Sequence, residues 1–130
     1  MGLILDTNFV IAAEREARRG VPGSADAFLS AHAAENFFIT FTVAGELACG
    51  QSAAIEKDWH RLCQPYAILP WTLEVSWRYG EIFRVLAAKG QLIGANDMWI
   101  AATALANGLG VVTKNRKEFS RVPGLQVESF

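Results

Sequence analysis

Hydrophobic residues occur along this chain in short runs and in longer, helix-spaced stripes. The short runs predict buried β-strands, since short apolar or β-branched runs bounded by turn signals are typical of strands. These runs lie at residues 3–5, 37–41, 67–69 and 111–113, with a fifth candidate at 125–128. The stripes predict α-helices at residues 8–18, 24–34, 43–49, 53–62, 72–89 and 96–107.

Two of the expected helices differ in how their apolar residues are spread. The longest has Val75, Tyr79, Ile82 and Leu86 at positions i, i+4, i+7 and i+11, which form one apolar stripe. The segment 96–107 is apolar on almost every side, so we expect it to be buried on most sides.

Strands that alternate with helices predict an α/β domain with a short, five-stranded and mainly parallel sheet. The strands are apolar along their whole length, which is typical of a sheet covered by helices on both faces. A length of 130 residues predicts a single domain, residues 1–130.

Composition excludes several classes of protein. With 52% hydrophobic and 19% charged residues, the chain is expected to fold as a globular protein. No apolar run approaches the ~20 residues of a membrane-spanning helix, so we expect no membrane partner. Cys49 and Cys63 are the only cysteines and form no CxxC motif, which argues against a disulfide scaffold or zinc site and favours the reducing cytoplasm.

The net charge of −1 gives no global signal for nucleic-acid binding, but the cations are clustered. Local basic clusters can contact phosphates even in a nearly neutral protein. Two such clusters are present, Arg15, Arg18 and Arg19 early in the chain and Lys114, Arg116, Lys117 and Arg121 late in the chain.

Three acidic residues occupy comparable places relative to the predicted strands. Asp6 follows the first strand, and Asp97 opens the buried helix before the fourth. Glu46 is expected in the first turn of the helix after the second strand, with Thr42 as N-cap. Open parallel sheets bind ligands beyond the carboxyl ends of their strands. The three carboxylates converge there if the helix of Asp97 begins at that edge.

Converging carboxylates repel one another and stay ionised together only when a cation neutralises them. Mg²⁺ prefers oxygen ligands and often completes its shell with substrate phosphates, and Mn²⁺ is a plausible substitute. The matching chemistry is metal-assisted hydrolysis of a phosphodiester, with basic residues at the rim holding the polyanion.

The chain contains in order the motifs DTN, EL, GxNDxxIAA and VTxN. Together these motifs resemble those of PIN-domain ribonucleases, specifically the VapC-type toxins of bacterial toxin–antitoxin pairs. This ordered set is fairly specific, and the resemblance covers essentially the whole chain. The matching stretches are residues 5–8, 46–47, 93–102, 112–115 and 118–125.

The resemblance implies a Mg²⁺-dependent endoribonuclease that acts on RNA in the cytoplasm and pairs with a small antitoxin protein. The metal-binding, catalytic acids of the family correspond to Asp6, Glu46 and Asp97. A fourth acidic position, common in the family, falls on Asn115, which can bind substrate or a metal-bound water. This leaves one charge fewer for a second metal ion, and compensation by Glu118 stays open.

Other interpretations of the same residues remain open. Asp6 can cap a helix, the helix dipole favours Asp97 at a helix start, and Glu46 can be an ordinary surface residue. An aspartate-dependent phosphatase would need a second Asp where Asn8 stands. A phosphoacceptor signalling domain would need an Asp where the third strand ends in Leu69 and Pro70, and a non-catalytic acidic-pocket binding module is the remaining alternative.

Aromatic residues at the start of the longest helix predict a homodimer, as the family resemblance also implies. Trp71, Trp77 and Tyr79 exceed what one inward stripe can bury, so Trp77 should lie beside that stripe. Exposed apolar patches usually mark interfaces, and a closed two-fold dimer is the commonest outcome.

Overall fold

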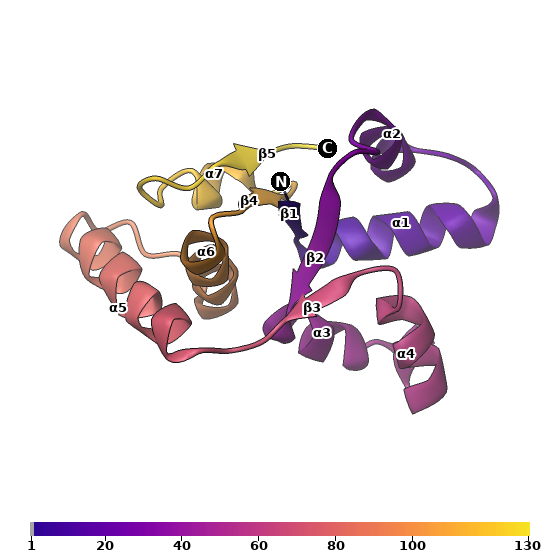
Figure 1. Ribbon diagram of the computed structural model, residues 1–130, viewed down its shortest axis with the longest axis horizontal. Helices are drawn as coiled ribbons and strands as arrows, with labels where there is room; N and C mark the ends of the chain where they lie inside the picture. The colour runs from indigo at the N-terminus through magenta and orange to yellow at the C-terminus, as the bar shows by residue number, and fades with distance from the viewer. Residues whose placement is uncertain (1) are drawn as a thin grey trace.

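A five-stranded parallel sheet forms the centre of the molecule, in the order β3–β2–β1–β4–β5 (Figure 1). The computed structural model describes residues 2–130. The strands are β1 (Gly2–Leu5), β2 (Asn36–Thr40), β3 (Ala67–Leu69), β4 (Gly110–Val112) and β5 (Val127–Glu128). Because β1 lies in the middle and is buried throughout, the residue that follows it stands at the centre of the sheet's carboxyl edge.

Helices cover the sheet on both sides, as the apolar strands predict. Figure 1 shows α1, α2 and α4 on one side and α5 and α6 on the other. The helices are α1 (Thr7–Arg19), α2 (Ser24–Ala31), α3 (Phe41–Ala48), α4 (Glu56–Cys63), α5 (Leu73–Ala88), α6 (Ala95–Asn107) and α7 (Arg116–Phe119), with a 3₁₀ turn η1 (Gln51–Ala53). The predicted α/β class and five-stranded parallel sheet are confirmed.

Helix α6 is the most deeply buried helix beside the sheet. Its alanines Ala101, Ala102 and Ala104 are fully buried, and their small side chains allow close packing against neighbouring elements. Ile100 of α6 is fully buried too, and burying an aliphatic side chain of this size stabilises the fold by about 1.5–3 kcal/mol. The prediction that this segment is buried on most sides is therefore confirmed.

Several element boundaries differ from the sequence-based expectation: α2 ends at Ala31 and not at 34, and β5 begins at Val127 and not at 125. Thr40, not Thr42, caps α3: its hydroxyl accepts a hydrogen bond from the Val43 N–H at 3.2 Å. Glu46 therefore lies in the second turn of α3, where the prediction placed it in the first. The helix expected at 53–62 begins later, at Glu56, and the four-residue helix α7 was not predicted.

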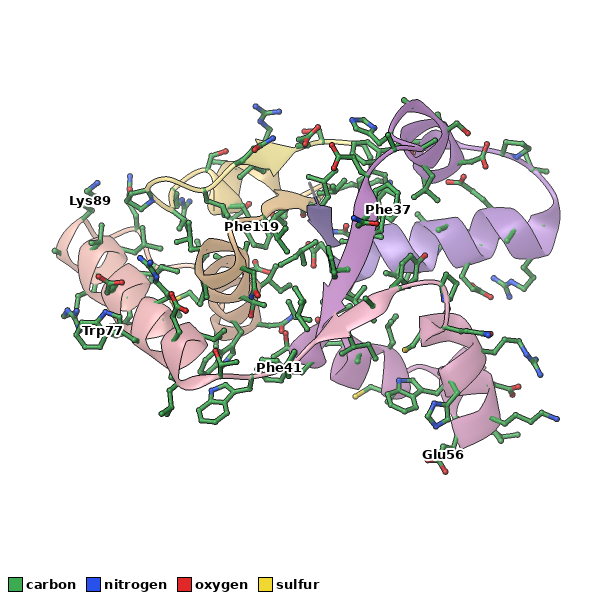
Figure 2. The ribbon with its side chains drawn as sticks, viewed as in Figure 1. Phe37, Phe41, Glu56, Trp77, Lys89 and Phe119 are labelled. Atoms are coloured by element: carbon green, nitrogen blue, oxygen red, sulfur yellow. The ribbon has the colours of Figure 1, made fainter. Side chains whose placement is uncertain are left out.

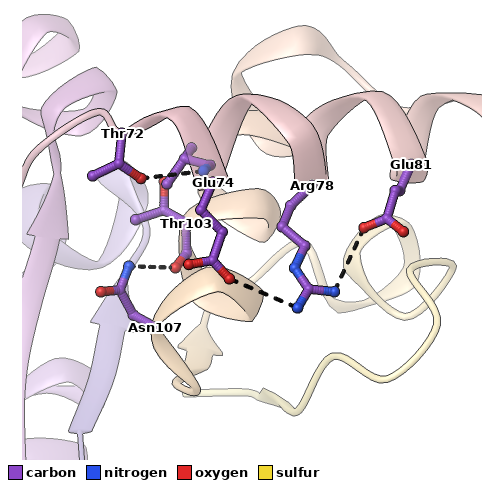
Figure 3. A network of polar contacts seen from close by, with 7 residues as sticks. Thr72, Glu74, Arg78, Glu81, Thr103 and Asn107 are labelled. Carbon is purple, nitrogen blue, oxygen red and sulfur yellow. Dashed lines mark hydrogen bonds and ion pairs between the residues drawn. The ribbon is translucent and has the colours of Figure 1, made fainter.

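The outer surface of α5 combines ion pairs with exposed aromatic side chains. Arg78 lies between Glu74 and Glu81, with nitrogen–oxygen distances of 3.8 and 3.5 Å (Figure 3). Trp77 is 59% exposed and points away from the sheet (Figure 2). Within residues 2–130, no helix is both long and apolar enough to cross a membrane.

Candidate active site

Asp6 stands at the junction of β1 and α1, where it is 5% exposed. It is the N-cap of α1, and its Oδ1 accepts a hydrogen bond from the Thr7 N–H at 2.7 Å. Its Oδ2 accepts from the hydroxyl of Thr113, just beyond β4, at 2.7 Å and from Asn8 Nδ2 at 3.3 Å. The capping interpretation is thus correct, and it coexists with a place at the edge where ligands bind.

Glu46 joins three helices at the same edge. Its Oε1 accepts hydrogen bonds from the Thr7 hydroxyl of α1 at 2.6 Å and from the Asn96 side-chain amide of α6. The residue itself is exposed to solvent. Glu46 therefore has fixed neighbours although it does not lie in the first turn of its helix.

Asp97 lies in the first turn of α6, and this helix does begin at the carboxyl edge. Its Oδ2 accepts a hydrogen bond from Asn115 Nδ2 at 3.1 Å. The positive end of the helix dipole also favours a carboxylate at this place. The condition on which the predicted convergence depended is met.

Ionisation of the two aspartates is disfavoured. Burial, followed by the nearby Asp6 carboxylate, raises the pKa of Asp97 to about 6, although the hydrogen bond from Asn115 opposes the shift. Glu46 and Glu118 add smaller repulsions in the same direction. Burial also raises the pKa of Asp6, against the hydrogen bonds from Thr113 and Thr7. The uncharged hydrogen-bond donors around the pocket therefore do not offset the burial and mutual repulsion of its carboxylates.

An open pocket of about 430 Å³ brings the predicted residues together. All four of Asp6, Glu46, Asp97 and Asn115 line it, and the exposed Lys114 contributes a positive charge. The remaining lining residues are Thr7, Asn8, Ile11 and Asn96. Arg15, Arg18 and Arg19 do not line this pocket.

The donor set of this pocket fits a hard cation. The Oδ1 atom of Asn8, next to Asp6, is buried without a hydrogen-bond partner among the described residues. Together with the carboxylates it supplies the oxygen atoms that Mg²⁺-like ions prefer. Within residues 2–130, no three His, Cys, Asp or Glu side chains already converge on one point as an ion would require. The carboxylates instead accept hydrogen bonds from the neutral donors described above.

Sequence analysis missed two residues that organise the pocket. Thr113 contacts a carboxylate 107 positions away, and Asn96 contacts one 50 positions away. Both belong to the recognised motifs, but only the folded chain shows their partners. The available signal was their position, one directly after β4 and the other directly before Asp97.

A family comparison agrees with this geometry over almost the whole molecule. The model of the PIN domain matches residues 3–125. The chain belongs to the PIN-domain family. Proteins of this family that are ribonucleases generally depend on a divalent metal ion.

Relatives and solved structures make the assignment more specific. The chain is 32% identical over 135 residues to ribonuclease VapC1 of Rickettsia felis, covering 98% of this chain and 95% of that protein. The VapBC2 structure of Rickettsia felis, bound to a promoter DNA fragment, gives a TM-score of 0.83 at 26% identity, covering 100% of this chain and 99% of that one. The structure of VapBC-1 from Haemophilus influenzae gives a TM-score of 0.75 at 26% identity, covering 99% of this chain and 98% of that one. The predicted VapC-type endoribonuclease of the PIN family is confirmed.

Proposed function

We propose that this chain is a Mg²⁺-dependent endoribonuclease that hydrolyses phosphodiester bonds of RNA as the toxin of a toxin–antitoxin pair. One observation carries the proposal: Asp6, Glu46 and Asp97 line one open pocket, where burial and mutual repulsion raise the pKa of both aspartates. A cation removes this repulsion, and polyanionic RNA brings phosphate oxygens that complete its shell.

Each residue of the pocket has a role in this proposal. Asp6, Glu46 and Asp97 hold the metal ion, with Mn²⁺ as a substitute. A bound ion of this type lowers the pKa of a water molecule and neutralises charge on the leaving oxygen. Lys114 attracts the RNA phosphates from the rim of the pocket.

Asn115 replaces the fourth acid that is common in the family. Its Nδ2 donates to Asp97, so its amide oxygen is free to accept a hydrogen bond from a metal-bound water or from substrate. Glu118 raises the pKa of Asp97 and so acts on the site electrostatically. We propose that Glu118 compensates only partly for the missing charge and that one metal ion is held more tightly than any second.

Two protein partners follow from the same assignment. The VapBC structures similar to this chain support a small antitoxin as its partner. The exposed Trp71, just before α5, and Trp77, within α5, support a homodimer, because exposed large apolar side chains often mark an interface. Sedimentation equilibrium at micromolar concentration tests the dimer, and a clean monomer contradicts it.

Cleavage of defined RNAs by the purified protein tests the activity. We expect cleavage with Mg²⁺, none with EDTA, and none from the Asp97→Asn variant with Mg²⁺. The matched control is Glu74→Gln, which also neutralises one carboxylate but lies on the outer face of α5 (Figure 3). Hydrolysis of a small phosphate ester without cleavage of RNA would favour a phosphatase instead. Binding of RNA without cleavage would favour a non-catalytic module.

A further inference from the structure

The hydroxyl of Thr113 contacts one aspartate of the pocket, Asp6, and the backbone of Asn115, whose side chain contacts the other, Asp97. It is 2.7 Å from Asp6 Oδ2 and 2.8 Å from the backbone nitrogen of Asn115. A backbone N–H can only donate, so the hydroxyl oxygen accepts from Asn115. Its single proton is then directed to Asp6, because an ionised carboxylate can only accept.

The neighbouring hydrogen bonds extend this contact into a continuous chain. Asn115 Nδ2 donates to Asp97 Oδ2 at 3.1 Å. The path therefore runs from Asp6 through Thr113 and Asn115 to Asp97. Hydrogen bonds join the successive residues, and Asn115 takes part with its backbone N–H on one side and its side-chain amide on the other. One carboxylate is thereby linked to the other through Thr113 and Asn115.

The side chain in the middle of this chain is held firmly. Thr113 is fully buried, and its backbone N–H donates to the carbonyl of Glu128 on β5 at 3.0 Å. Asp6 is tied to β4, the strand that ends directly before Thr113, since its N–H donates to the carbonyl of Val112 at 3.0 Å. A β-branched side chain also has few χ1 rotamers. The hydroxyl therefore has a fixed place relative to both aspartates.

We propose that Thr113 is a positioning residue whose hydroxyl sets the orientation of the Asp6 carboxylate relative to the Asn115–Asp97 pair. The inference rests on the proposed metal-dependent function. Groups that hydrogen-bond a metal ligand orient it before the ion arrives, and their loss typically lowers metal affinity or activity about 10–100-fold. Without the hydroxyl, Asp6 Oδ2 keeps only the 3.3 Å contact from Asn8.

Three variants separate the hydroxyl from the shape of the residue. Thr113→Val replaces the hydroxyl by a methyl group of similar volume, and Thr113→Ser keeps the hydroxyl. The matched control is Thr103→Val on α6, where an equally buried hydroxyl donates to the Trp99 carbonyl at 2.8 Å. Calorimetric titration with Mn²⁺ and measurement of kcat and KM on one RNA are the readouts.

The expected results are specific to the hydroxyl. Thr113→Val should weaken Mn²⁺ binding about 10–100-fold and lower kcat while leaving KM for RNA unchanged. Thr113→Ser should recover most of the lost affinity, and Thr103→Val should match the wild-type protein. Where Thr113→Val does not fold, Thr113→Ala and Thr113→Ser make the same comparison, since they differ only by the hydroxyl.

Two outcomes overturn the positioning role. One is wild-type Mn²⁺ affinity and kcat in Thr113→Val, and the other is an equal loss in Thr113→Val and Thr113→Ser. Asp97→Asn, assayed alongside, distinguishes this failure from failure of the proposed function. If Asp97→Asn is inactive while Thr113→Val is normal, the nuclease assignment stands and the positioning role is wrong. If Asp97→Asn is fully active, the nuclease site itself is wrong.

Discussion

Helix α1 has a hydrogen-bonded carboxylate near each end, and the two differ in what surrounds them. At its start, the buried Asp6 faces the pocket with Glu46 and Asp97. Near its end, Glu16 reaches the first turn of α2, where its oxygens accept from the N–H groups of Gly23, Asp26 and Ala25 at 2.8, 2.9 and 3.1 Å. Glu16 thus caps α2, whose own N-cap residue has no side-chain cap bond.

The pKa values of the two carboxyls shift in opposite directions. The N–H of Asp26, helped by those of Ala25 and Gly23, lowers the pKa of Glu16 against the effect of burial. At Asp6, burial outweighs the hydrogen bonds and raises the pKa. Hydrogen bonds alone therefore do not satisfy a carboxylate that is buried close to others. Glu16 is compensated by N–H groups of the protein itself, whereas in the proposed function the pocket carboxylates are compensated by a cation from outside.

The largest expected effect is loss of cleavage when the pocket loses a charge. Asp6→Asn and Asp97→Asn should each reduce Mg²⁺-dependent RNA cleavage below detection while the protein stays folded, because each change removes a charge and almost no volume. Circular dichroism checks the fold. The comparison predicts that Glu16→Gln keeps its activity. Full activity in both aspartate variants would contradict the assignment of the site.

The next effect is a loss of stability when the Glu16 cap is disturbed. A Cβ atom at Gly23 would lie 2.8 Å from Glu16 Oε2, so Gly23→Ala should displace the carboxylate and lower the urea midpoint of unfolding. The matched control is Gly80→Ala on α5, where the nearest atom is 3.6 Å away. An equal or higher midpoint for Gly23→Ala than for wild type would show that the cap contributes nothing.

The contributions of Glu16 and Asp97 to the stability of the fold should change with pH in opposite directions. The lowered pKa of Glu16 contributes stability above the unfolded-state pKa, and this is lost as pH falls through the folded-state pKa. The pKa of Asp97 is about 6 in the folded protein, against the ordinary value of 3.8 for an aspartate, so the folded state binds this proton more tightly. The stability of the fold therefore falls as the pH rises from about 4 to about 6.

Urea unfolding of the metal-free protein between pH 3 and pH 7 measures both slopes. Asp97→Asn should be more stable than wild type at pH 7, with a difference that vanishes near pH 4. Glu16→Gln should be less stable than wild type at pH 7 and converge with it at low pH. Added Mg²⁺ should remove the advantage of Asp97→Asn. An advantage that is independent of pH would contradict the charge-crowding explanation.

The smallest expected effect comes from adding a carboxylate to the pocket. Asn115→Asp replaces the amide that donates to Asp97 by a fourth carboxylate. It should tighten Mn²⁺ binding, because it adds a hard oxygen ligand, and lower the stability of the metal-free protein, because it adds repulsion. Calorimetry with Mn²⁺ measures the first effect. Unchanged affinity would place Asn115 outside the metal shell.

Much of the candidate site could be anticipated from strand ends, because parallel strands bring their carboxyl ends to one edge. This reasoning located Asp6 and Asp97 correctly. It misplaced the cap of α3, since Thr40 and Thr42 are both plausible caps and only the end of β2 decides between them.

The sequence alone determined the strands, the longer helices and the candidate acidic residues, because apolar periodicity, turn residues and acidic side chains are local properties of the chain. Tertiary structure alone decided which side chains meet. Thr113 reaches Asp6 only because β4 pairs with β1, and Glu16 caps α2 only because α1 and α2 turn back on each other. The same pairing buries Asp6 beside other carboxylates, and this burial sets its pKa apart from that of Glu16.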